Sequence, residues 1–467
     1  MPIDLRLEAG EVALCTDLYE LTVSAAFFDH AMNEQAAFEM ALRRMPPNRG
    51  YMIAAGIERL LEALEAYHFD AAAIAYLDSL KLFKPAFLDY LAGFRFTGEV
   101  RALAEGTIFF AGEPILEIHA PLIEGQIVET LALNQLGFAA MAATKAARCV
   151  GAAMGRRAID FGARRAQGAD AALIAARSSY LAGFAGTASV LAGQRYGIPV
   201  FGTMSHSFVM AHERERAAFD NFAASFSAPA TLLVDTYDTA RGVENAAALG
   251  VKLRESGSKL AGVRLDSGNL GALASRARKI LDQHGLNETA IFASGNLDEY
   301  KIEELLAAKA PIDAFGVGTA LAVSDDAPAG DFTYKLVEYQ GQPRLKLSAG
   351  KVSTPGRKQI FRACNTAGGY TGDLVGAIDE SSATVARVMK IPEAQVFPML
   401  ELQMERGVRR MPRPELNDSR ARVAAAMAKL DPRYRTIRKP SEYSVRTSAA
   451  INAMVITEKV RADHRQE

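Results

Sequence analysis

The sequence predicts an α/β protein whose middle part forms an irregular α/β barrel. Between about residues 196 and 334, short apolar runs alternate with helix-like segments, and the runs start about 20 to 35 residues apart, roughly the length of one strand and its following helix. Each run is apolar throughout, as expected for parallel strands that are buried on both faces. Together the two observations indicate a barrel domain over residues 131–334.

The runs that we expect to form strands follow one another along the chain. They are AIDFG (158–162), IPVFG (198–202), ATLLVD (230–235), LAGVRLD (260–266), AIFAS (290–294) and DAFGVG (313–318). In such folds the catalytic and binding residues lie at the carboxyl ends of the strands, because the loops and the first turns of the following helices meet there. The residues at the end of each run are therefore the candidates for a functional site.

The flanks of the barrel predict a split α+β domain, built from residues 1–130 and about 335–400. Residues 96–122 alternate polar and apolar side chains between Gly and Pro turns, as in an antiparallel or mixed sheet. A second strand-like block covers residues 332–363. Residues 401–467 are rich in Arg, and we expect them to form a C-terminal appendage.

The composition excludes several classes of protein. The 467 residues include 53 Lys and Arg and 54 Asp and Glu, so no bulk charge attracts the chain to nucleic acid or to a membrane surface. The three cysteines form no CxxC pair, which argues against a zinc site and a disulfide framework and favours a reducing compartment. Because the chain has no signal-like start and no apolar run of about 20 residues, we expect a soluble cytoplasmic protein.

Two glycine-containing turns are candidates for binding phosphate groups. The first consists of Ser294, Gly295 and Asn296, and the second of Gly316, Gly318 and Thr319. Backbone N–H groups at a helix start bind anions, and phosphates dock at the last strands of α/β barrels. The alternative is that both segments are tight turns without a ligand.

The segments RLDSGNL and VDTYDT place charged residues at two further strand ends. Arg264 suits a phosphate or a carboxylate, because its planar guanidinium donates two parallel hydrogen bonds, and Asp266 can bind ribose hydroxyls or Mg²⁺. Alternatively, Asp266 or Ser267 caps the next helix and Arg264 forms a structural ion pair. Asp235 and Asp238 have two interpretations as well, namely binding a ribose phosphate or capping a helix.

His206 stands where a predicted strand leads into a helix, in a loop with the hydroxyl residues Thr203 and Ser205. Beside a phosphate site, a histidine can act as a general base, as a cation or as a phosphoryl acceptor. A lone histidine at a strand end is also commonly a hydrogen-bonded structural residue. The residues alone therefore leave both interpretations open.

Several segments form a specific set in collinear order from about residue 12 to about residue 365. They are TDLYELT (16–22), RRMPPNRGYMIAAGIERLLEAL (43–64), DFGARRAQG (160–168), GTMSHSFV (202–209), RLDSGNL (264–270), FGVGT (315–319) and KVSTPGRKQIFR (351–362). Together they resemble the nicotinate phosphoribosyltransferase family. The resemblance implies the type II phosphoribosyltransferase fold, which is an irregular α/β barrel with a split N-terminal domain, and a homodimer with its site at the subunit interface.

The resemblance also implies a reaction, which is the first step of NAD salvage from nicotinic acid. Nicotinate and 5-phosphoribosyl pyrophosphate give nicotinate mononucleotide and pyrophosphate, and ATP hydrolysis drives the reaction through a phosphohistidine, as in an ATP-dependent, ligase-type enzyme. In this sequence His206 matches that histidine. Asp266 and Arg264 are the other catalytic candidates, and Mg²⁺ is expected to bind through the phosphates, with Asp266 as a candidate ligand.

The implied base pocket combines aromatic surfaces with a cation. By resemblance, Phe161 stacks on the pyridine ring, Tyr19 of the partner subunit covers the other face, and Arg164 binds the carboxylate or a phosphate. Nicotinamide-using relatives carry an aspartate after the Gly-Thr of a GTDTVAG-like stretch, where this chain has Ala188. An aspartate there would repel a carboxylate, so Ala188 favours nicotinate as the substrate.

Two alternatives to this function remain. One is a type II phosphoribosyltransferase specific for nicotinamide or quinolinate, and the other is a catalytically silent relative that binds nucleotides. Turnover with different bases separates these alternatives. Thr203, Ser205 and Asp235 complete the set of substrate-binding candidates.

Overall fold

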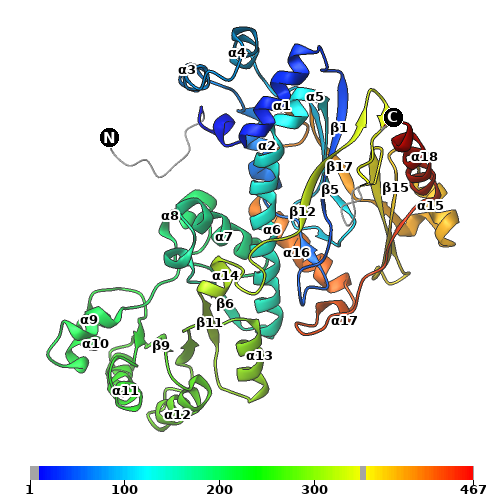
Figure 1. The fold of residues 1–467 in the computed structure, drawn as a ribbon. Coiled ribbons are helices and arrows are strands. Elements are labelled where there is room, and N and C mark those ends of the chain that lie inside the picture. Colours follow the sequence, from blue (N-terminus) through cyan, green and yellow to red (C-terminus); the bar gives the residue numbers. More distant parts are fainter. Residues whose placement is uncertain (1–9, 348–353, 466–467) are drawn as a thin grey trace. The chain divides into compact units, whose positions relative to one another are not determined.

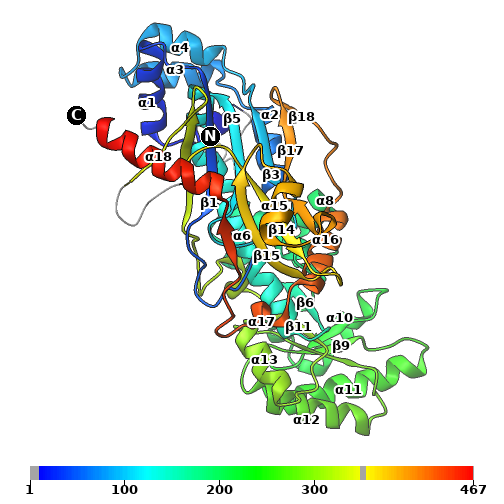
Figure 2. The same cartoon turned by 90° about the vertical axis from the view of Figure 1, so that its right-hand side faces the viewer.

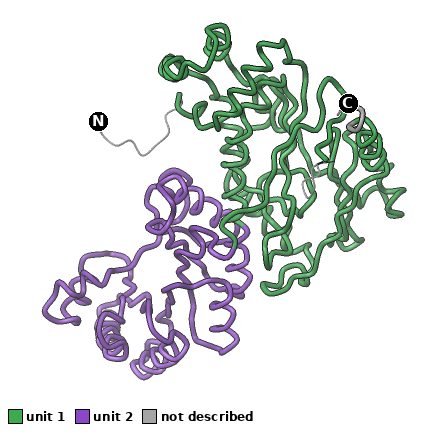
Figure 3. Tube along the Cα trace, viewed as in Figure 1, with its two compact units in different colours: residues 1–143, 327–467 green, residues 144–326 purple. Residues whose placement is uncertain are grey.

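The computed structural model describes residues 10–347 and 354–465, and the chain forms two compact units (Figure 3). Unit 1 consists of Met1–Ala143 and Ala327–Glu467, and unit 2 consists of Thr144–Asp326. Residues 351–353 of the motif at 351–362 lie outside the described residues. The division expected at about residues 130, 334 and 400 stays a prediction.

Unit 1 contains a seven-stranded sheet that joins segments far apart in the sequence. In spatial order its strands are β13 (Gln342–Pro343), β12 (Phe332–Tyr339), β1 (Gln35–Leu42), β5 (Pro114–Pro121), β3 (Glu99–Leu103), β17 (Leu400–Glu405) and β18 (Val408–Arg409). Neighbouring strands pair antiparallel throughout. The strands expected in residues 96–122 and 332–363 are therefore present, and residues from the Arg-rich C-terminal region complete the same sheet.

Two smaller sheets and a set of helices complete unit 1 (Figures 1 and 2). The sheets are formed by β16 (Val396–Pro398), β14 (Lys358–Cys364), β15 (Tyr370–Ala377) and β19 (Val445–Thr447), and by β2 (Met52–Ile53) and β4 (Ile108–Phe109). The helices are η1 (Val12–Leu14), α1 (Leu18–Asp29), α2 (Ile57–Glu65), α3 (Ala71–Ser79), α4 (Pro85–Ala92), α5 (Leu122–Ile127), α15 (Ser382–Met389), η3 (Glu393–Gln395), α16 (Leu416–Lys429), α17 (Pro432–Arg435) and α18 (Ala449–Arg465). Helix α6 (Glu129–Ala152) begins in unit 1 and ends in unit 2.

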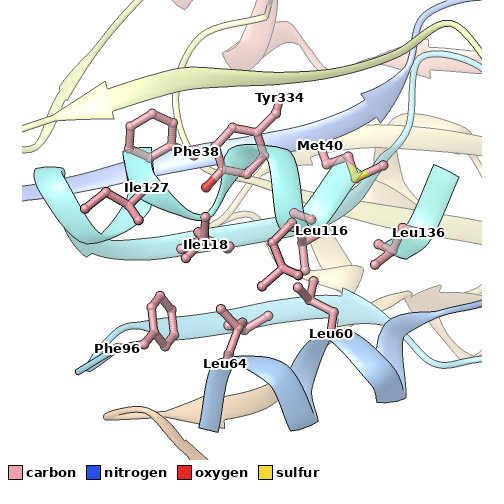
Figure 4. Packing of buried hydrophobic residues seen from close by; sticks show 14 of the residues in the cluster. Phe38, Met40, Leu60, Leu64, Phe96, Leu116, Ile118, Ile127, Leu136 and Tyr334 are labelled. Atoms are coloured by element: carbon pink, nitrogen blue, oxygen red, sulfur yellow. The ribbon is translucent and has the colours of Figure 1, made fainter. Parts of the chain in front are cut away.

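The core of unit 1 forms where helices pack on the seven-stranded sheet. In Figure 4, Leu60 and Leu64 of α2 point toward Leu116 and Ile118 of β5, and all four side chains are almost fully buried. Leu60 and Leu64 are four residues apart and therefore lie on one helix face, while Leu116 and Ile118 are two apart and lie on one face of the strand. The apolar pattern of the sequence thus directs both elements into one core.

Unit 2 is built on a six-stranded parallel sheet. In spatial order its strands are β7 (Gly186–Thr187), β6 (Arg157–Asp160), β11 (Ala314–Val317), β10 (Ala290–Ala293), β9 (Gly262–Leu265) and β8 (Thr231–Leu233). Every pairing in this sheet is parallel, and the middle strands are buried. The predicted α/β fold with a parallel sheet is confirmed.

One expected strand is wrong. The run IPVFG at 198–202 forms only an isolated parallel bridge between Val200 and Thr187, and β7 (Gly186–Thr187) takes the place beside β6 instead. Pro199 has no N–H to donate and contributes only its carbonyl, which accepts from the N–H of Thr187. The short segment therefore cannot extend into a regular ladder.

Helices follow most strands of unit 2, and side-chain caps fix where several of them begin. The helices are η2 (Ala163–Arg165), α7 (Ala169–Leu181), α8 (Val190–Tyr196), α9 (His206–Met210), α10 (Glu215–Ala224), α11 (Thr239–Glu255), α12 (Leu270–Gln283), α13 (Glu299–Ala307) and α14 (Thr319–Ala322). Ser205, Asp238, Asn269 and Asp298 cap α9, α11, α12 and α13 by accepting a backbone N–H. Each cap is worth about 1 kcal/mol and holds a strand-to-helix loop in place.

Candidate active site

The carboxyl ends of the adjacent strands β9 and β10 bring three predicted residues together. Arg264 donates from Nε to Ser294 Oγ at 2.8 Å and from Nη2 to Asp266 Oδ1 at 2.6 Å. Ser294 in turn donates from Oγ to Asp266 Oδ1. Arg264 also donates from Nη1 to Thr203 Oγ1 at 3.0 Å. We call Thr203, Arg264, Asp266 and Ser294 the strand-end array.

The ion pair in this array is accessible to a ligand. The side chains of Arg264 and Asp266 are 11% and 27% exposed, respectively. Burial opposes ionisation of Asp266, but the hydrogen bond from Ser294 and the charges of Arg264 and His206 outweigh it and lower the pKa of the carboxyl group. Asp266 is therefore a stable carboxylate that faces solvent beside a fixed guanidinium.

His206 lies next to the array as the first residue of α9. Its Nδ1 is 3.1 Å from Thr236 Oγ1, and its Nε2 is 3.9 Å from Asp266 Oδ2. The imidazole side chain is 41% exposed. The ring is thus oriented by a hydroxyl on one side, faces a carboxylate on the other, and stays open to a ligand.

Asp235 and Asp238 have different surroundings, although they are only three residues apart. Asp235 Oδ2 accepts hydrogen bonds from the N–H of Asp266 and the hydroxyl of Ser267, both at 2.8 Å. Its buried Oδ1 has no hydrogen-bond partner among the described residues. Asp238 caps α11 by accepting from the N–H of Arg241. The capping interpretation therefore holds for Asp238, whereas Asp235 contacts Asp266 of the strand-end array.

The helix after β9 is capped by neither of the residues considered for that role. Asn269 accepts from the N–H of Ala272 and caps α12, so Asp266 and Ser267 are not its caps. Arg264 does form an ion pair, as the structural interpretation expected, but with the partly exposed Asp266. Both side chains remain in a position from which they can bind a ligand.

The predicted phosphate-binding turns differ from each other. In the first turn, Gly295 has φ of 99°, and a Cβ atom there would lie 2.0 Å from the carbonyl oxygen of Asp266. Only glycine permits this close approach, which packs the turn against the array. Asn296 follows it in a left-handed conformation with φ of 49°. The hydroxyl of Ser294 is already used within the array.

The second turn contains fewer turn residues than expected. Gly316 lies inside β11, where a Cβ atom would come within 2.8 Å of the Phe161 ring. Gly318 precedes α14, which starts at Thr319. Gly316 therefore makes room for Phe161, and phosphate binding by Gly316, Gly318 and Thr319 stays a prediction.

A cavity of about 470 Å³ lies beside the array in unit 2. It is lined by Phe161, Arg164, Ala188, Phe201, Gly202, Thr203, Met204, Ser205, Phe208, Phe222, Ser225, Phe226 and Arg264. Arg264 also stacks over the Phe161 ring, with its guanidinium carbon 5.2 Å from the centroid. The predicted aromatic surface, cation and Ala188 thus line one space. Cavities of this kind, largely apolar with a few polar groups, are typical of small-molecule sites.

A buried carboxylate holds the segment that carries Phe161. Asp160 accepts from the N–H of Gly162 and from the hydroxyl of Thr187, both at 2.7 Å. Burial raises the pKa of the Asp160 carboxyl group. Asp160, the last residue of β6, is therefore a structural residue that fixes the start of the loop carrying Phe161.

Tyr19 belongs to unit 1, near the start of α1, and its side chain is exposed. Its predicted part in a base pocket stays a prediction. Among the described residues, no group of three or more His, Cys, Asp and Glu side chains is arranged to hold a metal ion. In the same part of the chain, no helix is both long and apolar enough to cross a membrane.

Sequence reasoning missed some residues of the site. Thr236 contacts His206 but was overlooked between the two aspartates of VDTYDT. Phe208, Phe222 and Phe226 form the aromatic wall of the cavity, with ring centroids 5.6 Å and 5.0 Å apart in successive pairs. Phe222 lies in α10 and Phe226 lies just beyond its end, so no helical period in the sequence indicated this wall.

Comparison with known proteins identifies one family along most of the chain. Residues 14–136 match the nicotinate phosphoribosyltransferase (NAPRTase) N-terminal domain, residues 157–357 match the NAPRTase family, and residues 357–455 match the nicotinate phosphoribosyltransferase C-terminal domain. The nicotinate phosphoribosyltransferase pncB2 of Mycobacterium tuberculosis is 52% identical over 370 residues, which cover 79% of each chain. The human nicotinate phosphoribosyltransferase is 31% identical over 524 residues, covering 97% of each.

Solved structures agree with the sequence comparison. The crystal structure of human nicotinic acid phosphoribosyltransferase superposes with a TM-score of 0.84 at 30% identity and covers 95% of this chain and 99% of its own. A nicotinate-nucleotide pyrophosphorylase from Pyrococcus furiosus superposes with a TM-score of 0.74 at 26% identity, covering 92% and 99%. The chain therefore belongs to the nicotinate phosphoribosyltransferase family.

Proposed function

We propose that this chain catalyses the transfer of a phosphoribosyl group from 5-phosphoribosyl pyrophosphate to nicotinate, giving nicotinate mononucleotide and pyrophosphate in NAD salvage. The observation that carries this proposal is the strand-end array, which combines an open carboxylate and a fixed guanidinium beside a cavity with an aromatic and cationic lining. Family membership over most of the chain adds to this support.

Asp266 and Arg264 have complementary roles in this proposal. The ring nitrogen of nicotinate attacks C1 of the ribose while the bond from C1 to the pyrophosphate oxygen breaks, so positive charge develops on the sugar. Asp266 stabilises that charge, because its lowered pKa keeps it ionised throughout the neutral range. Arg264 holds the negative charge of a donor phosphate and keeps Asp266 in place.

His206 accepts a phosphoryl group from ATP and couples ATP hydrolysis to the transfer. The exposed ring and its place at the start of α9, next to the hydroxyl groups of Ser205 and Ser207, support this role. Added negative charge at a helix start is favourable, because the first backbone N–H groups lack partners within the helix. ATP is then a co-substrate, and the enzyme is of the ligase type.

The residues at the array fit a divalent cation that also binds the substrate phosphates. Mg²⁺ commonly binds to one or two carboxylates together with phosphate oxygens and water. Asp235 offers a buried oxygen, Oδ1, without a partner among the described residues, and its other oxygen, Oδ2, accepts from the backbone N–H of Asp266. When bound, Mg²⁺ would neutralise the charge that develops on the departing pyrophosphate.

Base selection depends on the cavity. Phe161 offers a ring face, Arg164 offers a cation for the carboxylate, and Ala188 places no acceptor for an amide group in the lining. This combination supports nicotinate over nicotinamide. Quinolinate has two carboxylates and would need a second cation beside Arg164. Among the described lining residues only Arg264 could supply it, and Arg264 is assigned to a donor phosphate, so the lining favours nicotinate over quinolinate as well.

The assembly and the location belong to the same proposal. Tyr19 covers the pyridine ring in a homodimer whose site lies at the subunit interface, and its exposed side chain on α1 supports this role. Cys15, Cys149 and Cys364 form no disulfide bond in the described part of the chain, which supports a reducing cytoplasm.

The test is turnover by the purified chain with 5-phosphoribosyl pyrophosphate and Mg²⁺. Nicotinate, nicotinamide and quinolinate are each supplied with and without ATP, and the mononucleotide products are separated and identified by mass. We expect nicotinate mononucleotide and its stimulation by ATP. Product from another base alone would support one of the other specificities, and binding of the donor without any product would support the silent relative.

A further inference from the structure

A buried ionic cluster lies at the start of α13, the helix that follows the turn after Ser294. Glu299, the first residue of α13, is fully buried and accepts from Lys145 Nζ at 2.7 Å and from Arg148 Nε at 2.8 Å. Both cations come from α6, and their side chains are only 1% and 2% exposed. No step of the proposed reaction uses these three residues.

The cluster extends to a second segment of unit 2. Lys145 Nζ also lies 3.0 Å from Asp325 Oδ1 and 2.9 Å from Asp326 Oδ1, just beyond α14. Burial disfavours the charged lysine, but the surrounding carboxylates, Glu299 above all, outweigh it and raise the pKa of Lys145. The lysine therefore stays charged and connects α6, α13 and the segment after α14.

Glu299 is connected to the strand-end array through a short and tightly packed turn. Four residues separate it from Ser294, which bonds to both Arg264 and Asp266. In between, Gly295 packs so closely on the backbone of Asp266 that a Cβ atom would lie 2.0 Å from its carbonyl oxygen. A shift of the start of α13 therefore cannot be absorbed in the turn without moving Ser294 or Asp266.

We propose that Glu299, held by Lys145 and Arg148, is a positioning residue that fixes Ser294 and thereby orients Arg264 and Asp266 for binding the phosphoribosyl donor. Ser294 is the only contact through which the Nε of Arg264 is held in the described part of the chain. Displacing reacting groups by about 1 Å can reduce the rate of catalysis about 100-fold. A buried residue that sets the position of Ser294 can therefore change the rate without touching substrate. The inference rests on the proposed function, because it assigns the array to the donor.

The test compares Glu299→Gln and Lys145→Met with a matched control. In Glu299→Gln, Lys145 keeps Asp325 and Asp326, so its charge is not left unpaired and the variant is expected to fold. The control is Arg278→Met, which removes an ion pair to Asp282 and bonds to the carbonyls of Leu286 and Thr289 near the amino end of β10. Arg278 holds the opposite end of this strand from Ser294.

The measurements are calorimetric binding of 5-phosphoribosyl pyrophosphate with Mg²⁺, the KM values for donor and for nicotinate, and the melting temperature. We expect Glu299→Gln to raise the Kd and KM for the donor about 10-fold or more with little change in the KM for nicotinate, and Lys145→Met to act in the same direction. Arg278→Met lowers the melting temperature and leaves the donor Kd unchanged.

The outcomes separate this inference from the proposed function. Variants that melt lower but bind the donor like the unmodified chain overturn the positioning role, because the cluster is then only structural. An unmodified chain that binds the donor but makes no nicotinate mononucleotide overturns the proposed function, and the donor Kd of the variants still decides the inference. A chain that does not bind the donor at all overturns both.

Discussion

Each unit contains an Arg–Asp ion pair, which is open to solvent in unit 2 and buried in unit 1. In unit 2, Arg264 Nη2 lies 2.6 Å from Asp266, and both side chains reach solvent. In unit 1, Arg362 Nη2 also lies 2.6 Å from Asp373, but the two side chains are 3% and 0% exposed. The length of an ion pair therefore does not distinguish a functional pair from a structural one.

The surroundings of the two pairs make the distinction. Arg362 lies over the rings of Phe110 and Tyr370, and Tyr443 donates to Asp373, so every face of the unit 1 pair is covered by protein. The neighbours of Arg264 and Asp266 are small hydroxyl side chains, a partly exposed histidine and, over Arg264, the ring of Phe161, which itself lines the cavity. A pair that is held in position yet open on one side can bind substrate, whereas a pair enclosed on all sides can only stabilise the fold.

The largest expected effect tests the enclosed pair. Asp373→Asn leaves the guanidinium of Arg362 without its bidentate carboxylate in a buried site, so we expect the free energy of unfolding to fall by about 3 to 5 kcal/mol. Denaturant titration measures the loss. Turnover per folded molecule should remain close to that of the unmodified chain, and a selective loss of turnover at unchanged stability would contradict the structural role.

The matching substitution in the open pair should have the reverse profile. Asp266→Asn removes the charge that faces the developing cation, so we expect kcat to fall about 100-fold to 1000-fold. Because the carboxylate is part of a partly exposed pair, the free energy of unfolding should change by at most about 1 kcal/mol. Steady-state kinetics and denaturant titration on the same preparation check both. A large loss of stability with nearly normal kcat would make this pair structural too.

The third prediction concerns His206, which lies beside the open ion pair of unit 2. The His206→Ala variant cannot accept a phosphoryl group, so ATP should no longer stimulate turnover. The KM for the phosphoribosyl donor should rise about tenfold, since one lost charge-assisted hydrogen bond is worth about 1.4 kcal/mol or more. Turnover is measured over a range of donor concentrations with and without ATP. Unchanged stimulation by ATP would remove His206 from this role.

The next effect concerns the lining of the cavity. Ala188→Asp places a carboxylate near the predicted site of the nicotinate carboxylate, and repulsion of about 1 kcal/mol should raise the KM for nicotinate about 5-fold. Ala188→Asn, which has a similar size without the charge, is the control. If both variants weaken nicotinate equally, the effect is steric and the charge argument fails.

The smallest effect is a difference in pH dependence between the two units. The pKa of Asp266 is lowered from 3.8, so the folded state holds the carboxyl proton less tightly than the unfolded state does. The stabilising contribution of the carboxylate is therefore lost as the pH falls below about 3.8. Burial and the nearby Asp373 raise the pKa of Glu113 in unit 1 above 4.5, so the folded state keeps its proton, and stability is lost as the pH rises above that value.

Unfolding free energies from pH 3 to pH 7 check both signs. The free energy of unfolding of the unmodified chain should fall relative to that of Asp266→Asn toward low pH. Relative to that of Glu113→Gln, it should fall toward high pH. Curves that run parallel to those of the unmodified chain would contradict both assignments.

The sequence was sufficient for the parts of the fold that follow from apolar pattern and capping. The runs before Asp235, Asp266 and Ser294 became β8, β9 and β10, because buried parallel strands need continuous apolar residues. The run at 198–202 failed because Pro199 limits its hydrogen bonding, which an apolar count does not register. The pairing of β17 with β3 joins residues some 300 apart, and no local pattern encodes such a partner.

The candidate site was predictable in its members but not in its contacts. The strand-end rule identified Arg264, Asp266 and Ser294, and these residues meet because β9 and β10 are adjacent in the sheet. It could not show that Ser294 binds the other two, or that Asp238 caps a helix while Asp235 does not. Glu299 looks like an ordinary acidic residue in a first helical turn, and only the fold shows that it is buried between two cations.

The most direct test of the central claim is to assay the purified chain and its Asp266→Asn variant with nicotinate, 5-phosphoribosyl pyrophosphate and Mg²⁺. The mononucleotide and the pyrophosphate released are quantified in the same reaction. We expect equal amounts of both products from the unmodified chain and at least about 100-fold slower formation by the variant, with both proteins equally folded. Equal rates from the two proteins, or no mononucleotide from the unmodified chain, would contradict the account.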